Sequence, residues 1–144
     1  MSRTALIGRA KELYVATLLV GRGLHVYFPL VDNGFDLIVT KPDGSDFLPV
    51  QVKYKSARTG FSLKKVDGLR FAAVNAVLAF GAEEANENGF YFFPAAAWLQ
   101  RAQDRGRRDD KLVVYLAEDR EWAEPYRGTK GIELAFAKVL AAHG

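Results

Sequence analysis

Two turn sequences constrain what this chain can fold into more than any other feature. They are Asp32-Asn33-Gly34 and Pro42-Asp43-Gly44, and they separate three short apolar runs. Both are typical of tight turns, since glycine accepts positive φ values and proline presets φ for a turn. We therefore predict three adjacent strands joined as a meander, over residues 24–30, 35–41 and 46–55.

Apolar periodicity predicts helices and further strands on both sides of this meander. Residues 4–21 have few helix breakers before Gly21-Arg22-Gly23 and predict a first helix. Its apolar residues surround the helix axis, so we expect the fold to enclose most of it. After a polar loop containing Gly60, the patterns predict a short helix (64–73), strands at 76–80 and 90–93, a helix (95–105), a strand (112–116) and a terminal helix (131–142). The apolar run at 76–80 does not by itself distinguish a strand from a helix. This order favours an α/β fold with a mixed central sheet flanked by helices.

Length and composition favour one domain and exclude several kinds of site. A chain of 144 residues buries about two thirds of its unfolded surface, so residues 1–144 are expected to form a single domain. The absence of cysteine excludes disulfides and thiolate metal sites. No phosphate-binding glycine loop or dinucleotide motif is present, so no organic cofactor is expected. Charged residues interrupt the first helix, which argues against a signal peptide or a membrane span and favours a cytoplasmic protein.

Four polar residues predict a candidate site beside the meander. Strand alternation places Gln51 and Lys53 on one face of residues 46–55, and the hairpin brings them next to Asp36. Glu12 shares a helix face with apolar residues, so it needs a partner, either Lys53 or a metal ion held with Asp36. Carboxylate and amide oxygens suit a hard divalent cation, and a lysine adds positive charge. The combination suits hydrolysis of a phosphodiester bond.

The positive charge of the chain is concentrated next to this site. Residues 50–70 contain six basic and one acidic residue, whereas residues 1–49 balance five of each. Such a surface would hold nucleic-acid phosphates that flank the reacting one. The predicted DNA contacts are Lys55, Arg58, Lys64, Lys65 and Arg70.

Several of these residues together resemble the PD-(D/E)xK nuclease superfamily. The likeness rests on Gly8 and Glu12 in the first helix, Gly34-Phe35-Asp36-Leu37, and Pro49-Val50-Gln51-Val52-Lys53, and it covers about residues 5–56. Among the branches, it is most similar to the group I intron homing endonucleases of that fold, which carry Gln-x-Lys. The resemblance implies a restriction-endonuclease-like core: a helix, a three-strand meander, a helix and a strand.

The same resemblance implies a DNA endonuclease that depends on Mg²⁺, with Mn²⁺ as a substitute. Asp36 would bind the metal, Gln51 would replace the usual acidic ligand, and the Val52 carbonyl would complete the shell. Lys53 would position the nucleophile or stabilise the transition state, and Glu12 would be the helix carboxylate. Because Gln51 carries no charge, metal affinity is expected to fall unless Glu12 compensates.

Other readings of the same residues stay open. Asp36 could be a buried acid paired with a lysine, and Glu12 could neutralise Arg9 or Lys11. Gln51 and Lys53 could form the solvated face of an edge strand. All of these would be structural roles. The second candidate function is a catalytically inactive DNA-binding or assembly module on the same fold. A third is an interaction protein of an unrelated mixed fold. The residues do not distinguish DNA from RNA.

The size of the chain bears on its assembly. A domain this small has little room for an added recognition element, so selectivity for a long site or a branched structure would need a homo-oligomer. A dimer or a tetramer is expected.

Overall fold

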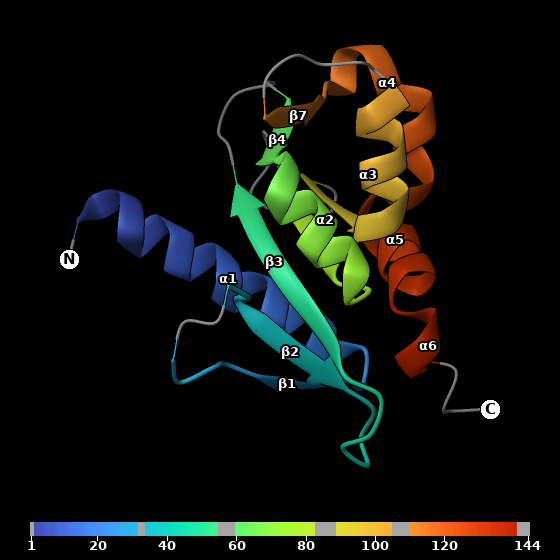
Figure 1. The fold of residues 1–144 in the computed structure, drawn as a ribbon. Helices are drawn as coiled ribbons and strands as arrows, with labels where there is room; N and C mark the ends of the chain where they lie inside the picture. Colours follow the sequence, from blue (N-terminus) through green and yellow to red (C-terminus); the bar gives the residue numbers. More distant parts are fainter. Residues whose placement is uncertain (1, 32–33, 55–59, 83–88, 105–109, 141–144) are drawn as a thin grey trace.

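The computed structural model describes residues 2–31, 34–54, 60–82, 89–104 and 110–140 (Figure 1). Along the chain the elements are α1 (Arg3–Gly21), β1 (His25–Tyr27), β2 (Leu37–Thr40), β3 (Leu48–Tyr54), β4 (Phe61–Lys64), α2 (Lys65–Ala73), β5 (Val77–Gly81), β6 (Phe90–Pro94), α3 (Ala95–Asp104), β7 (Lys111–Val114), α4 (Leu116–Ala123), η2 (Glu124–Tyr126), α5 (Gly128–Ala135) and α6 (Ala137–Leu140). None of the described helices combines the length and the hydropathy needed to cross a bilayer.

The central sheet is mixed and has the strand order β1-β2-β3-β5-β6. Strands β1, β2 and β3 pair antiparallel, with Leu37 opposite Val50, which confirms the predicted meander. Strand β3 then pairs in parallel with β5, where Gln51 lies opposite Leu78, and β5 pairs antiparallel with β6. The parallel pair is possible because the connection from β3 to β5 includes α2, which crosses over the sheet (Figure 1). The predicted α/β fold with a mixed sheet flanked by helices is confirmed.

Alternate residues of the sheet face two separate cores. Phe90 and Phe92 of β6 belong to the core that includes residues of α1 and α5. Tyr91 and Phe93 belong to the core that includes residues of α2 and α3. Because successive side chains on a strand point to opposite faces, one short aromatic run fills both layers. Each face of the sheet is thus covered by its own set of helices.

Helix α1 is less enclosed than its sequence predicts. Its buried residues are Val15, Ala16 and Leu19, all in the C-terminal half. Leu6, nearer the N-terminus, is 55% exposed, and Figure 1 shows this end extending beyond the sheet. The neighbouring strands β1 and β2 are only 3 and 4 residues long, so the sheet offers no surface for the first turns of a 19-residue helix.

Sequence periodicity misses β4 and α4 and misplaces two boundaries. Strand β4 lies in a region predicted as a polar loop. It pairs antiparallel with β7 in a separate two-stranded sheet. The strand predicted at 112–116 ends at Val114, and Leu116 begins α4. The predicted terminal helix is two shorter helices, α5 and α6. Four-residue strands and eight-residue helices are too short to establish a clear period.

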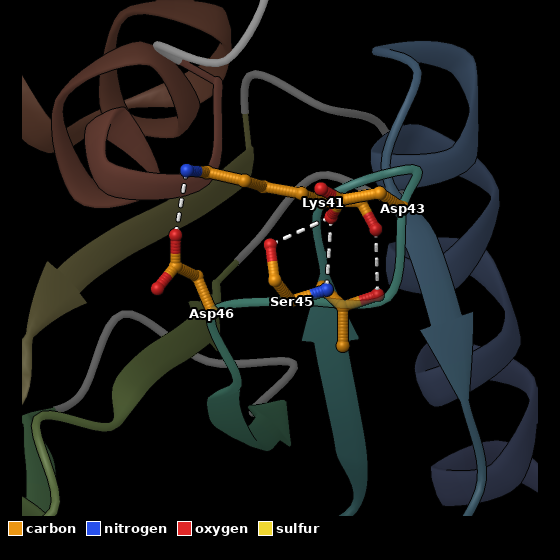
Figure 2. A network of polar contacts seen from close by, with 5 residues as sticks. Lys41, Asp43, Ser45 and Asp46 are labelled. Carbon is orange, nitrogen blue, oxygen red and sulfur yellow. Dashed lines mark hydrogen bonds and ion pairs between the residues drawn. The ribbon is translucent and has the colours of Figure 1, made fainter.

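A polar network closes the hairpin between β2 and β3 (Figure 2). The Gly44 N–H donates to the Lys41 carbonyl at 2.8 Å, and the Lys41 N–H donates to the Ser45 carbonyl at 3.0 Å. The Ser45 N–H and hydroxyl both donate to Asp43 Oδ1, at 3.0 and 2.6 Å. Lys41 Nζ lies 2.6 Å from Asp46 Oδ2. These contacts confirm the predicted turn and help to set the register in which β3 meets β2.

Replacing Lys41 with methionine is expected to raise the pKa of Asp46. The hydrogen bond and the charge of Lys41 hold the pKa of this carboxyl below its usual value. A carboxyl whose pKa is lower in the folded state stabilises the fold above its unfolded pKa, and this contribution is lost as the pH falls through the folded pKa. Titration of the Asp46 carboxyl carbon by NMR, in wild type and Lys41→Met, measures the change.

The control for this titration is Asp43 in the same loop. The pKa of Asp43 is lowered mainly by the hydroxyl and N–H of Ser45, with Lys41 contributing less. It should therefore stay low in Lys41→Met. If Asp46 titrates identically in both proteins, the ion pair with Lys41 does not form in solution.

Candidate active site at the start of β2

Asp36 lies immediately before β2 and is fixed to β3 through both its main chain and its side chain. Its N–H donates to the Val50 carbonyl at 3.0 Å. Its Oδ2 accepts a hydrogen bond from the Val52 N–H at 2.7 Å. The carboxylate therefore continues the pattern of strand pairing at the point where β2 begins. The sheet itself orients this side chain.

Gln51 and Lys53 lie on the face of β3 that α2 covers. Val50 and Val52 alternate with them and enter the core on the α1 side. Gln51 is half-buried and Lys53 is exposed. Together with Asp36 they line one hollow of about 260 Å³. The structure thus brings three of the four predicted site residues together.

Glu12 shares a hollow with Asp36 but not with Gln51 or Lys53. It lines a second hollow, of about 290 Å³, to which Arg9, Pro29, Leu30, Phe35 and Asp36 also contribute. Its Oε1 accepts a hydrogen bond from Arg9 Nη1 at 3.0 Å, which is the structural alternative considered for this residue. Asp36 is common to both hollows, whereas Gln51 and Lys53 line only the first.

Helix α2 contributes residues to the first hollow that sequence reasoning missed. Asp67 lines it beside Asp36 and Gln51, and so does Arg70, which was expected on a flanking surface. An acidic residue in the first turn of a helix is common because it complements the helix dipole, so Asp67 gave no signal of a site. Gly34, predicted only as a turn residue, also lines this hollow.

The other predicted DNA contacts fall into two groups. Lys64 and Lys65 are exposed at the junction of β4 and α2, and neither lines the hollow. Lys55 and Arg58 lie outside the described residues.

The oxygen atoms at the first hollow suit a hard divalent cation. Asp36 offers a carboxylate and Gln51 an amide oxygen. The Val52 carbonyl points toward the same neighbouring strand as the Val52 N–H, which reaches Asp36. Mg²⁺ is commonly held by one or two carboxylates, water and substrate phosphates, so this donor set fits it. Within the described ranges, no three His, Cys, Asp or Glu residues group as metal ligands.

Comparisons with known proteins identify the fold of the chain but match no sequence family. No protein family model matches the sequence, and no curated protein sequence matches it. Several solved structures do match, among them two nucleases. One is the Holliday junction resolvase Hjc of the archaeal hyperthermophile Archaeoglobus fulgidus, with a TM-score of 0.61 and 16% identity over 89% of this chain and 94% of Hjc. The other is a bacterial homing endonuclease, with a TM-score of 0.60 and 22% identity over 99% of this chain and 98% of that enzyme.

The chain has the fold of these two nucleases. The predicted restriction-endonuclease-like core is therefore confirmed at the level of the fold. Because the likeness runs along nearly the whole chain, it includes the segment that carries Asp36, Gln51 and Lys53.

Proposed function

We propose that this protein is a divalent-metal-dependent DNA endonuclease that hydrolyses phosphodiester bonds. The observation that carries the proposal is the convergence of Asp36, Gln51 and Lys53 on one hollow, in a fold shared with two nucleases. A carboxylate and an amide oxygen suit a hard divalent cation, and an ammonium adds positive charge beside a phosphate. Residues 1–144 would act as one nuclease domain.

The placement of each side chain supports its proposed role. Asp36, oriented by the Val52 N–H, is the charged oxygen ligand for Mg²⁺, and Gln51 is the neutral one. Lys53 places a positive charge where negative charge grows on the phosphate in the transition state. Glu12, which shares the second hollow with Asp36, is the helix carboxylate of the site. A bound Mg²⁺ ion would supply Lewis acidity and a more acidic water.

A plasmid nicking assay tests the proposal. Supercoiled, linear, branched and single-stranded DNA are incubated with Mg²⁺, with Mn²⁺ or with chelator alone. Cleavage of at least one DNA form with either metal, and its absence with chelator, is expected. Bound but uncut DNA in every arm would instead support an inactive module.

The charge at position 51 is expected to control metal affinity. Gln51→Glu should bind Mn²⁺ more tightly than wild type because it adds a carboxylate to the shell, and Gln51→Ala should bind it more weakly. A change of about tenfold in either direction corresponds to about 1.4 kcal/mol. Calorimetry with Mn²⁺ measures the affinity without any cleavage. Equal affinities for all three proteins would remove Gln51 from the metal shell.

We propose that Lys64 and Lys65, at the start of α2, hold phosphates that flank the cut. Lys55 and Arg58 are proposed to do the same. The double variant Lys64→Ala, Lys65→Ala should weaken binding about equally for all DNA sequences. The slope of log affinity against log salt should fall by roughly 0.9 for each lost phosphate contact. Fluorescence anisotropy over a salt series gives this slope. A slope equal to that of wild type would mean that these lysines do not contact DNA.

A catalytically inactive DNA-binding or assembly module is the second candidate. Two observations favour it: a neutral Gln51 stands among the predicted ligands, and Glu12 is already paired with Arg9. The nicking and calorimetry experiments separate the two functions, since an inactive module binds DNA without cleaving it.

We also propose that the protein works as a homo-oligomer, a dimer or a tetramer. Apolar side chains remain exposed on the first half of α1 and on the segment after β1, among them Leu6, Ile7, Leu30 and Val31. Exposed apolar surface of this kind is typical of association sites. Light scattering coupled to gel filtration measures the number of chains.

A further inference from the structure

The guanidinium of Arg70 is held in place by groups from two parts of the chain. Its central carbon lies 5.5 Å from the ring centre of Phe35 and 4.8 Å from that of Phe71. Its Nη2 lies 3.6 Å from Asp67 Oδ1. Contacts with aromatic rings restrict a side chain that otherwise samples many rotamers. These contacts therefore hold the Arg70 guanidinium in one position, although the side chain is 45% exposed.

The backbone of Gly34 provides the space that this guanidinium occupies. A Cβ atom at position 34 would lie 2.3 Å from Arg70 Nη1, too close for both atoms to stay. Gly34 also has a φ of +90°, in the region that L side chains rarely adopt. The glycine of this turn is thus matched to the position of Arg70 as well as to the turn itself.

We infer that Arg70 binds the reacting phosphate itself, and not a phosphate flanking it. The inference rests on the proposed nuclease function, and it adds a residue to that site. Arg70 lines the same hollow as Asp36, Gln51 and Lys53, so a phosphate lying there meets Lys53 from the sheet and Arg70 from α2. Lys64 and Lys65, on the same stretch of chain, do not line it.

Arginine suits this task better than lysine. Its planar fork donates two parallel hydrogen bonds to a phosphate, whereas an ammonium acts as a point charge. Without DNA, the carboxylate of Asp67 lies next to the Arg70 guanidinium. The incoming phosphate would compete with this carboxylate for the same N–H groups.

Two variants disturb the Arg70 guanidinium in different ways. Arg70→Lys keeps the charge and removes the bidentate geometry. Gly34→Ala keeps Arg70 and displaces its guanidinium. Both should lower the single-turnover nicking rate at saturating supercoiled plasmid by about 10² or more, the size of loss seen when one transition-state donor is removed. The salt slope of DNA binding should stay the same in Arg70→Lys because the number of charges is unchanged. Arg120→Lys makes the same change at an exposed position of α4 that lines neither hollow, and should nick at the wild-type rate.

An NMR measurement tests the contact without relying on cleavage. Addition of a short DNA duplex, with Ca²⁺ in place of Mg²⁺, should shift the Nε–Hε resonance of Arg70. The Nε–Hε of Arg101, which donates to the buried Asp119 at 2.8 Å, should stay unmoved and serves as the internal control. A shifted Arg70 resonance without cleavage by wild type would refute the proposed enzyme and retain the phosphate contact. An unmoved Arg70 resonance, or nicking by Arg70→Lys within about threefold of wild type, overturns the inference even where wild type cleaves DNA.

Discussion

Nicking of supercoiled DNA is expected to fall at least about 10³-fold in both Asp36→Asn and Lys53→Ala. The first change removes the charged ligand of the proposed metal site, and the second removes the positive charge proposed to lie beside the reacting phosphate. Asparagine is the better replacement at position 36 because its amide oxygen can still accept the Val52 N–H. Alanine would leave that N–H without this acceptor, at a cost of about 1–3 kcal/mol in the free energy of unfolding. Single-turnover rates and urea unfolding should be measured on the same samples.

The matched control for Lys53→Ala is Lys138→Ala, which removes an exposed lysine from α6, outside both hollows. It should nick DNA at the wild-type rate. Wild-type nicking by Asp36→Asn or Lys53→Ala, in folded protein, would show that the chemistry takes place elsewhere on the molecule.

The second large effect is expected on stability, at the ion pair between α3 and α4. Asp119 is 1% exposed, and its Oδ1 accepts hydrogen bonds from Arg101 Nε at 2.8 Å and Nη2 at 2.5 Å. Arg101→Met keeps the apolar stem and leaves a buried carboxylate without this guanidinium. The free energy of unfolding should fall by about 3–5 kcal/mol.

Asp119→Asn should cost less, about 1–3 kcal/mol, because it removes the buried charge and keeps an oxygen acceptor. Arg101, whose side chain is 32% exposed, can then turn to water. Urea unfolding gives both values. The double variant Arg101→Met, Asp119→Leu should recover part of the loss of Arg101→Met, since apolar pairs often replace buried ion pairs without penalty. Arg101→Met unfolding at the wild-type urea midpoint would mean that the pair gives no net stability.

The meander could be predicted because its signals are local. The turn at Pro42-Asp43-Gly44 and the alternation around Gln51 predict the strands β2 and β3 and the faces of β3, and the structure agrees with both. Asp32 and Asn33 of the other predicted turn lie outside the described residues. The exposure of α1 could not be predicted, because it depends on how far β1 and β2 extend beneath the helix. Strand β4 has four residues, and its partner β7 lies far along the chain, so no local pattern identifies it.

The candidate site could be predicted only where its residues lie on adjacent strands. The proximity of Asp36 to Gln51 and Lys53 could be predicted from the hairpin between β2 and β3 and from the alternation of side chains along β3. Glu12, Asp67 and Arg70 reach the region from helices whose angle to the sheet is set by tertiary packing. Spacing in sequence therefore could not show that Arg70 lines the first hollow, or that Glu12 lines the second.

The hydrogen bond from the Val52 N–H to Asp36 also has an entropic consequence. A carboxylate on an ordinary surface rotates among several positions and must lose that freedom when it binds an ion. Here one oxygen is tied to the sheet before any ion arrives, so most of that loss was already incurred when the strands paired. The proposed ion site at Asp36 and the pairing of β2 with β3 thus depend on the same ordered backbone. Any change that loosens the β2–β3 pairing should then weaken ion binding without touching a single ligand.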